Sequence, residues 1–397
     1  MINSILERLQ RFVFPLSIGI IVLFVVARFS FGGFNFSRFI VAGSDFVQAD
    51  TEHPNLIINE GQGYDGQFFY RYAHHPFNKE KTAYGVTVDH IEYRIQRIVY
   101  PASVWLFSIG GTKSLIPFFL VLLNVLAFVG IFFISLKICE HYNADKLLAI
   151  LPLFLFGAYM SLARDTSEIF EVFFFSLAIY SIIKENFFLF VGSILLSIFS
   201  RETSLIAIGP LTFLYVLKLI KTNKLNGLLI LKLISLSVPF VAMVCWKYYL
   251  HVSIHSEVLV DGSQNLSLPF VGVYYGAINN FNFLDDKSTF ETIFWSSFLV
   301  WNIVFVVSVI KAIKFKQIMK LDVASMLTIV YLFWAVFSLF LGPAIYIDDW
   351  GFVRIFTLWN MIGFFILMIN NRMLNKYLLS YSCLILFLLM IRLIIRV

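Results

Sequence analysis

The sequence predicts an all-α polytopic membrane protein with about eleven transmembrane helices. Three observations support this prediction. The 397 residues are 59% hydrophobic and only 14% charged, with a mean hydropathy of +0.84. The chain contains 46 Phe, 18 Tyr and 7 Trp, more apolar surface than the core of a soluble protein buries. Runs of about 20 apolar residues recur along the chain, and each is long enough to cross a bilayer as a helix.

The chain begins with a predicted transmembrane helix, residues 1–27. No small-x-small cleavage site follows its apolar run, so we expect this helix to be retained. The next long apolar run begins near residue 114, and residues 28–113 therefore form one large extracytoplasmic loop. Within this loop, Ile91 to Ile109 is amphipathic, and we predict an interfacial helix that lies on the outer membrane surface.

Closely spaced apolar segments fill most of the remaining chain. Residues 114–250 are predicted to form the central transmembrane helices, residues 251–290 a second extracytoplasmic loop, and residues 291–397 the C-terminal transmembrane helices. Two segments, 170–183 and 187–200, are short for a complete crossing.

The basic residues predict the orientation. With a cytoplasmic N-terminus, the cytoplasmic turns collect most of the lysines, as the positive-inside rule requires. The short opposite loops then hold only isolated basic residues, namely Arg164, Arg201, Lys287 and Arg354. Arg392 and Arg396 fall on the opposite side and count against this assignment. The net charge of +6 is explained by these turns, so we expect no nucleic-acid partner.

The same orientation gathers acidic and arginine side chains on the extracytoplasmic side. They lie in the first loop, with Asp45 and Asp65, and in the turns 164–168, 200–203 and 347–350. Such groups are costly in a bilayer unless they pair or face a cavity. Their gathering on one side predicts a cavity that opens to the outer face.

The stretch from Gly61 to Pro76, GQGYDGQFFYRYAHHP, is the densest polar segment of the chain. It resembles the acidic motif in the first outer loop of GT-C fold glycosyltransferases, in which an Asp-Gly pair precedes an aromatic run and an Ala. The closest resemblance is to bacterial membrane proteins linked to cell-surface glycopolymer formation. Its motifs appear here in order as Gly63 to Arg71, Tyr93 to Pro101, and Arg201-Glu202-Thr203, and they cover the N-terminal half.

The resemblance implies a GT-C-like fold and a transferase in the bacterial cytoplasmic membrane. Its expected partners are a polyprenyl-phosphate sugar donor, a lipid-linked or surface glycan acceptor, and membrane lipids. Fold-level resemblance does not fix the sugar or the acceptor. A requirement for a divalent metal stays open.

Asp65 is the predicted catalytic residue. As a general base it would remove the proton from an acceptor hydroxyl, which is typically worth roughly 100- to 10,000-fold in rate. Arginines are suited to the leaving phosphate because their planar forks match phosphate oxygens. The predicted substrate-binding residues are Tyr64, Gln67, Tyr70, Arg71, Arg94, Arg97, Asp165, Glu168, Arg201 and Glu202.

Alternatives exist for these residues. Tyr-Asp-Gly is also good turn chemistry, so Asp65 is alternatively a turn residue. Asp45 is the rival base. Asp348 and Asp349 resemble a cation or sugar site as much as an ordinary outer turn.

No metal site is predicted. Cys139, Cys245 and Cys383 lack metal-ligand or disulfide spacing. His251 and His255 are four residues apart but have no third candidate ligand nearby.

Two other function classes compete with the transferase. The first is a transporter or flippase of a lipid-linked or small polar solute, which would often show internal repeats and broken helices. No repeat is evident, and the polar groups collect at one membrane face. The second is a structural subunit of an envelope assembly, in which Asp65 would have no catalytic role.

Overall fold

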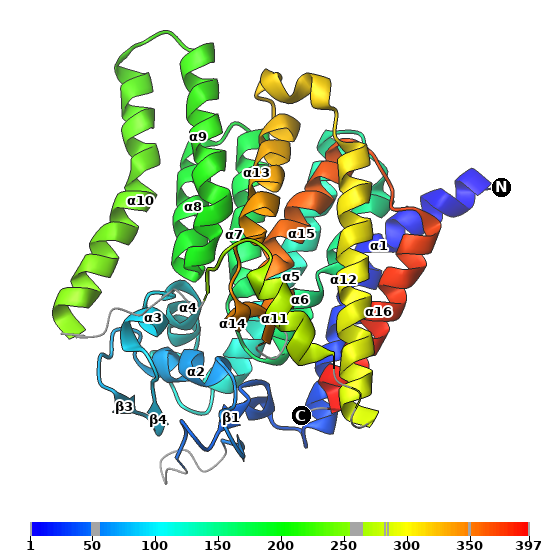
Figure 1. The fold of residues 1–397 in the computed structure, drawn as a ribbon. Coiled ribbons are helices and arrows are strands. Elements are labelled where there is room, and N and C mark those ends of the chain that lie inside the picture. Colours follow the sequence, from blue (N-terminus) through cyan, green and yellow to red (C-terminus); the bar gives the residue numbers. More distant parts are fainter. Residues whose placement is uncertain are drawn as a thin grey trace.

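The computed structural model describes residues 2–48, 56–254, 265–281, 283, 286–347 and 351–395. These residues form a helical bundle with a small, mixed region at one end (Figure 1). The bundle helices are α1 (Ile2–Phe31), α5 (Ile116–His141), η2 (Lys146–Phe154), α6 (Phe156–Ala163), α7 (Glu168–Ile183), α8 (Phe187–Ser200), α9 (Leu205–Thr222), α10 (Gly227–Ile254), α12 (Asp286–Ala312), α13 (Val323–Ser338), α15 (Gly351–Ile369) and α16 (Lys376–Ile395).

The structure agrees with the prediction of a helical chain that crosses a membrane several times. It does not establish the predicted number of about eleven crossings. Seven described helices are long and apolar enough to cross a membrane. Each predicted apolar segment is helical, but α7, α8 and α13 are shorter than a full span. Within the predicted central segment, 114–250, one crossing is broken into a 3-10 helix, η2, followed by α6 at an angle of 54°. Pro152 lies just before this break, where it lacks a backbone donor for a continuous helix.

Helix α15 is the centre of the bundle. It packs against α5, α6, α7, α12 and α13, and Phe352 to Met368 are buried throughout. Because this helix is surrounded by protein, a charged residue within it must find a partner in a neighbouring element.

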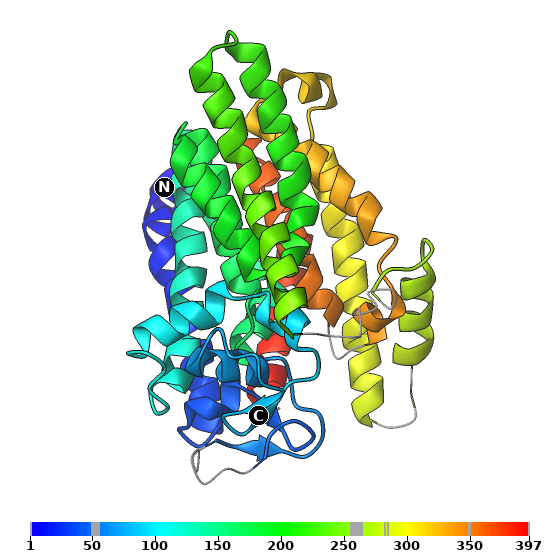
Figure 2. The same cartoon turned by 90° about the vertical axis from the view of Figure 1, so that its left-hand side faces the viewer.

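The described part of residues 32–115 forms a loop region at one end of the bundle (Figure 2). Two small sheets shape it, a parallel pair and an antiparallel pair. Its elements are η1 (Phe36–Phe39), β1 (Ala42–Gly43), β2 (Ile58–Asn59), α2 (Gly66–His74), β3 (Thr82–Ala83), β4 (Val86–Thr87), α3 (Ile91–Ile95) and α4 (Val99–Phe107). All nine residues of α2 are buried, so the loop region has a packed interior of its own.

The predicted interfacial helix from Ile91 to Ile109 is corrected to two short helices, α3 and α4. The physical reason is Pro101, whose ring excludes a continuous helix through the carbonyl four residues earlier. Helix α4 still exposes a run of apolar side chains at its C-terminal end. These are Trp105, Leu106, Phe107 and, just beyond, Ile109.

The predicted second loop, 251–290, is shorter than expected because α10 extends to Ile254 and α12 begins at Asp286. Between them lies α11 (Val271–Asn280), which packs against α14 (Pro343–Ile347). Both short helices lie at the same end of the bundle as the loop region (Figures 1 and 2). The lysine-rich 3-10 helix η5 (Phe315–Lys320) and the α9–α10 turn lie at the opposite end (Figure 1).

Glycines allow the Asp65 turn to approach the bundle closely. A Cβ at Gly66 would lie 2.3 Å from the carbonyl oxygen of Arg164 and 2.5 Å from that of Ile40. Both neighbours are backbone atoms, so only a backbone shift would make room. The turn that carries Asp65 is therefore held directly against the turn between α6 and α7.

We expect Gly66→Ala to lower the apparent melting temperature in detergent, because overpacking of this kind costs about 1–3 kcal/mol. Gly192→Ala is the matched control, since a Cβ at Gly192 in α8 meets nothing within 4 Å. Equal melting temperatures for the two variants would contradict the close approach at Gly66.

Candidate functional site

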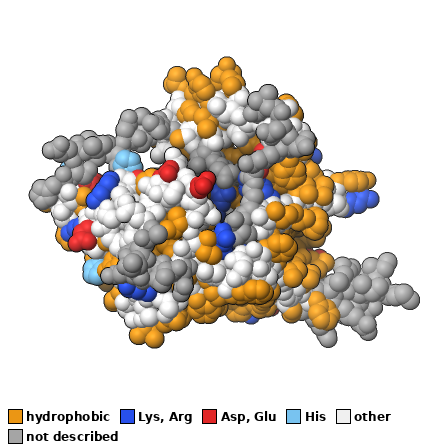
Figure 3. Space-filling model, turned by 90° about the horizontal axis from the view of Figure 1, so that it is seen from below, with side chains coloured by type: hydrophobic (Ala, Val, Ile, Leu, Met, Phe, Trp, Pro, Cys, Tyr) orange, Lys and Arg blue, Asp and Glu red, His pale blue; other side chains and the backbone are white. Residues whose placement is uncertain are grey.

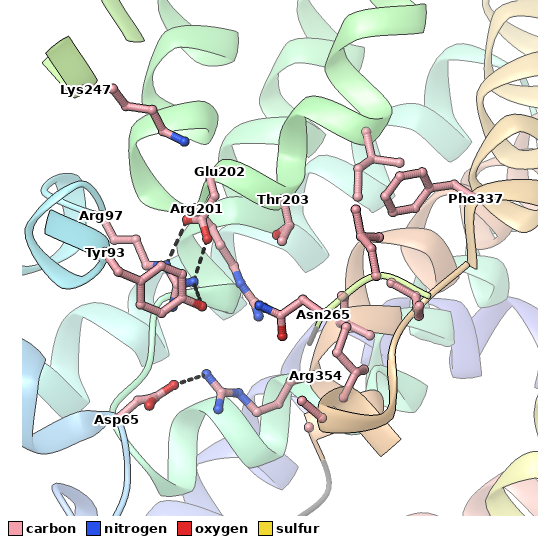
Figure 4. Close-up of a pocket in the computed structure, with 17 residues that line it drawn as sticks. Asp65, Tyr93, Arg97, Arg201, Glu202, Thr203, Lys247, Asn265, Phe337 and Arg354 are labelled. Atoms are coloured by element: carbon pink, nitrogen blue, oxygen red, sulfur yellow. Dashed lines mark hydrogen bonds and ion pairs between the residues drawn. The ribbon is translucent and has the colours of Figure 1, made fainter. Parts of the chain in front are cut away.

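A cavity of about 620 Å³ lies where the loop region meets the bundle (Figure 4). One part of its lining is polar and the other is apolar. The polar residues are Asp65, Tyr93, Arg97, Arg201, Glu202, Thr203, Lys247, Asn265 and Arg354. The remaining residues are Ile206, Leu266, Phe337, Leu341, Ala344, Ile345, Gly351 and Ile355. Seen from the loop end, charged side chains lie near the middle of the molecule and hydrophobic ones cover much of its flank (Figure 3).

Asp65 is held between two arginines from distant parts of the chain. It is the residue just before α2, and its side chain makes no capping hydrogen bond. Arg94 of α3 donates to Oδ1 at 2.7 Å, and Arg354 of α15 donates to Oδ2 at 3.0 Å. Burial alone would raise the pKa of Asp65, but the charges of Arg94, Arg354 and Arg97 hold it well below its usual range.

Arg94 is fixed by a second carboxylate. Its Nε and Nη2 donate to the two oxygens of Asp89 at 2.9 and 2.6 Å. Its guanidinium also lies 4.3 Å from the ring centre of Phe68. This bidentate pair and the aromatic contact orient Arg94 toward Asp65.

Arg354 joins the loop region to the bundle. Its Nε donates to Oε1 of Glu168 at 2.7 Å, and Glu168 begins α7. The same carboxylate lies 2.9 Å from Nη1 of Arg201. The ring of Tyr64 lies 4.8 Å from the Arg354 guanidinium. Glu168 and Arg354 are both buried, so each charge is compensated within the protein.

A second ion pair, between buried Arg97 and partly buried Glu202, lies on the other side of the cavity. Arg97 donates to both oxygens of Glu202 at 2.8 and 2.6 Å, and it also donates to the hydroxyl of Tyr93. Thr203 donates to Glu171 at 3.1 Å. Arg201 lies between Glu168 and Glu171, the latter at 3.9 Å. Arginines and carboxylates thus alternate around the cavity.

The structure brings together six of the predicted site residues. These are Asp65, Arg94, Arg97, Glu168, Arg201 and Glu202. Tyr64 is adjacent, but its ring packs between the guanidinium groups of Arg164, at 4.0 Å, and Arg354. The Tyr64 ring, predicted to bind substrate, thus packs on arginine side chains in this structure.

Three predicted residues of α2 do not line the cavity. Gln67 bridges the loop region, accepting from the Gly43 amide at 3.0 Å and donating to the Gln62 carbonyl at 2.9 Å. The buried ring of Tyr70 packs edge-on against a histidine of the same helix. Arg71 is fully buried and donates to Asn78 at 3.2 Å. These side chains organise the loop region because α2 is surrounded by protein.

Asp165 also lies away from the cavity. It is fully buried, its φ is +47°, and neither carboxylate oxygen has a hydrogen-bond partner among the described residues. The rival base Asp45 is exposed and does not line the cavity. The other candidate motifs, His255 and Asp348-Asp349, lie outside the described residues.

No group of three or more His, Cys, Asp or Glu within the described ranges is arranged to hold a metal ion. Comparison of the chain with protein-family models, curated proteins and solved structures finds no match. The interpretation of the site therefore rests on its own geometry and on the motif resemblance.

Sequence reasoning did not include Arg354, Asp89 or Lys247 among the site residues. Arg354 carried a usable signal, because an arginine in the first turn of an otherwise apolar helix requires a partner or a cavity. Asp89 is five residues before Arg94 and belongs to no recognised motif. Lys247 is close to the C-terminal end of α10, where the sequence gives no sign that it borders the cavity.

Proposed function

We propose that this protein is a GT-C-type membrane glycosyltransferase that moves a sugar from a polyprenyl-phosphate donor to a lipid-linked or surface glycan acceptor. The observation that supports this most directly is the two-part lining of the cavity. Arginines and carboxylates border one part, and Ile206, Phe337, Leu341 and Ile345 border the other. A cavity of this kind suits an amphiphile with an anionic head group and an apolar chain.

The donor phosphate is placed against Arg97, Arg201 and Arg354, which all line the cavity. Planar guanidinium groups bind phosphate oxygens in pairs, and they stabilise charge that develops on a leaving phosphate. The first isoprene units would lie along Phe337 and Leu341, on the apolar side. This places the sugar near Asp65.

In the transfer step, the acceptor hydroxyl oxygen attacks the anomeric carbon of the sugar. The bond from that carbon to the phosphate oxygen breaks, and its electron pair leaves with the lipid phosphate. Asp65 accepts the proton of the hydroxyl. General-base assistance of this kind is typically worth roughly 100- to 10,000-fold in rate.

We place the cavity on the extracytoplasmic face of a bacterial cytoplasmic membrane, with the N-terminus in the cytoplasm. The sorting of lysine-rich turns and the loop region to opposite ends of the bundle supports this orientation (Figure 1). The exposed apolar end of α4 fits a position at the membrane surface.

A transporter or flippase is the second candidate. The bent pair of η2 and α6 favours it, because broken helices are common in transporters. The cavity, however, lies where the loop region meets one end of the bundle, and transporter sites lie near the bilayer midplane. This position favours a reaction at a membrane face over transport through the membrane.

The test is sugar transfer by the purified protein in nanodiscs. The protein is supplied with a panel of labelled polyprenyl-phosphate sugars and a membrane lipid extract as the acceptor source. We expect one donor to be consumed and its label to appear in an extracted product. Movement of a labelled lipid between leaflets with no donor consumed would support the flippase instead.

A further inference from the structure

The cavity contains almost no unpaired positive charge. Among its described lining residues, Lys247 is the cation without an ion pair, and it is exposed. Arg97, Arg201 and Arg354 are each within 3.0 Å of a carboxylate oxygen. An anion that enters the cavity therefore meets arginines that are already ion-paired, and of these Arg201 still has Nε and Nη1 without a hydrogen-bond partner among the described residues.

The three arginines differ in which carboxylates would lose an ion-pair partner if the arginine moved to an anion. Glu202 is partly buried, with its side chain 18% exposed, and its one ion pair among the described residues is with Arg97, so loss of Arg97 would leave this carboxylate without an ion-pair partner. Loss of Arg201 would remove the one ion pair that the structure describes for buried Glu171. An uncompensated buried charge is strongly unfavourable.

Arg354 is the exception, because both of its carboxylates have a second arginine. Asp65 keeps Arg94 at 2.7 Å, and Glu168 keeps Arg201 at 2.9 Å. Arg354 also lines the cavity, whereas Arg94 does not and is fixed by Asp89. Of the three cavity arginines, Arg354 is thus the one whose move from its carboxylates to a bound anion costs the least free energy.

We propose that Arg354 is a switch that couples anion binding to the release of Asp65. In the empty cavity Arg354 holds Asp65 in an ion pair. When a phosphate monoester or diester binds, Arg354 turns to the phosphate oxygens and leaves Oδ2 of Asp65 free to accept a proton. Arg354 thus contacts the phosphate directly, and it acts on the proton transfer through Asp65.

The charged groups around Asp65 agree with this role. Arg94, Arg97 and Arg354 all lower its pKa, which makes Asp65 a weak base while the cavity is empty. Removal of one nearby positive charge typically raises a carboxyl pKa by about 1–3 units, and an anion bound nearby acts in the same direction. Asp65 would therefore be a weak base in the empty cavity and a stronger base once a donor is bound.

The test uses dicyclohexylcarbodiimide, which reacts with protonated carboxyl groups, and mass spectrometry of the peptide that contains Asp65. At a fixed, mildly acidic pH, we expect farnesyl phosphate to increase the labelling rate of Asp65 about 10- to 1,000-fold, the equivalent of 1–3 pKa units. Farnesol, which has the same apolar chain and no phosphate, should leave the rate unchanged. This comparison needs no mutation, so it does not depend on the folding of a variant.

Arg354→Gln should give fast labelling without any ligand, and farnesyl phosphate should add no further increase. Arg392→Gln is the matched control, because Arg392 is also a buried arginine paired with a glutamate, at 2.9 Å, in the α12–α16 contact. We expect Asp65 in this variant to respond to farnesyl phosphate as in the wild type. The proposal is overturned if farnesyl phosphate does not bind, or if it binds and Asp65 labelling stays at the farnesol level.

The inference rests on the proposed function in one respect, namely that the natural anion is the phosphate of a lipid-linked donor. The labelling experiment requires no sugar and no acceptor. If labelling responds to farnesyl phosphate while no sugar is ever transferred, the switch stands and the glycosyltransferase proposal fails. If sugar is transferred but labelling does not respond, the glycosyltransferase proposal stands and the switch fails.

Discussion

Asp65→Asn should abolish most sugar transfer while the protein stays folded. The amide has nearly the same shape as the carboxylate but cannot accept the proton of the acceptor hydroxyl, so we expect kcat to fall roughly 100- to 10,000-fold. Both arginines keep other carboxylates, since Arg94 pairs with Asp89 and Arg354 with Glu168. The fold should therefore tolerate the change.

The donor KM distinguishes this explanation from simple damage to the cavity. With Asp65 neutral, the remaining positive charge of Arg354 has one competitor fewer, so the donor KM should stay equal or decrease. Steady-state kinetics with a single labelled donor measures both parameters. A raised KM with an unchanged kcat would show that Asp65 contributes to binding and not to proton transfer.

Asp45→Asn is the matched control for this prediction. Asp45 is the rival base from the same loop region, and it is exposed and outside the cavity lining. The substitution removes the same charge from the same side of the membrane. We expect transfer at the wild-type rate, and a large loss in this variant would move the catalytic role to Asp45.

The sequence predicted the part of the site that depends on local motifs. Asp65, Arg94, Arg97, Arg201 and Glu202 belong to three short motifs, and the structure brings all of them to one cavity or its border. The reason is topological, because the loop region and the turn between α8 and α9, which carry these motifs, meet at the same cavity.

The differences between the predicted residues and the cavity lining have a different physical origin. Gln67, Tyr70 and Arg71 share the motif of Asp65, but they follow it on a helix whose nine residues are all buried, so they face other neighbours. Motif membership does not show which face of a short helix meets a cavity. Arg354 contacts Asp65 across 289 residues of sequence, and no local pattern reports such a contact.

Glu168→Gln should destabilise the protein more than any other single conservative change in the site. Glu168 is the carboxylate that Arg354 and Arg201 share, and its side chain is 1% exposed. Its neutralisation leaves two buried arginines near each other with less compensation. Breaking a buried ion pair by removing one partner costs about 3–5 kcal/mol, so we expect a clear decrease in the apparent melting temperature in detergent.

Glu291→Gln is the control. It separates the stability lost by neutralising the shared carboxylate of Glu168 from the stability lost by neutralising any ion-paired glutamate of a membrane helix. Glu291 pairs with the buried Arg392 at 2.9 Å, but its own side chain is 23% exposed. Solvent and lipid head groups can compensate Arg392 near this partly exposed position. The decrease in apparent melting temperature should therefore be smaller for Glu291→Gln than for Glu168→Gln. Equal decreases in the two variants would mean that Arg201 and Arg354 are adequately compensated by Glu171 and Asp65. In that case the shared position of Glu168 between Arg201 and Arg354 would add no stability beyond that of an ordinary ion-paired glutamate.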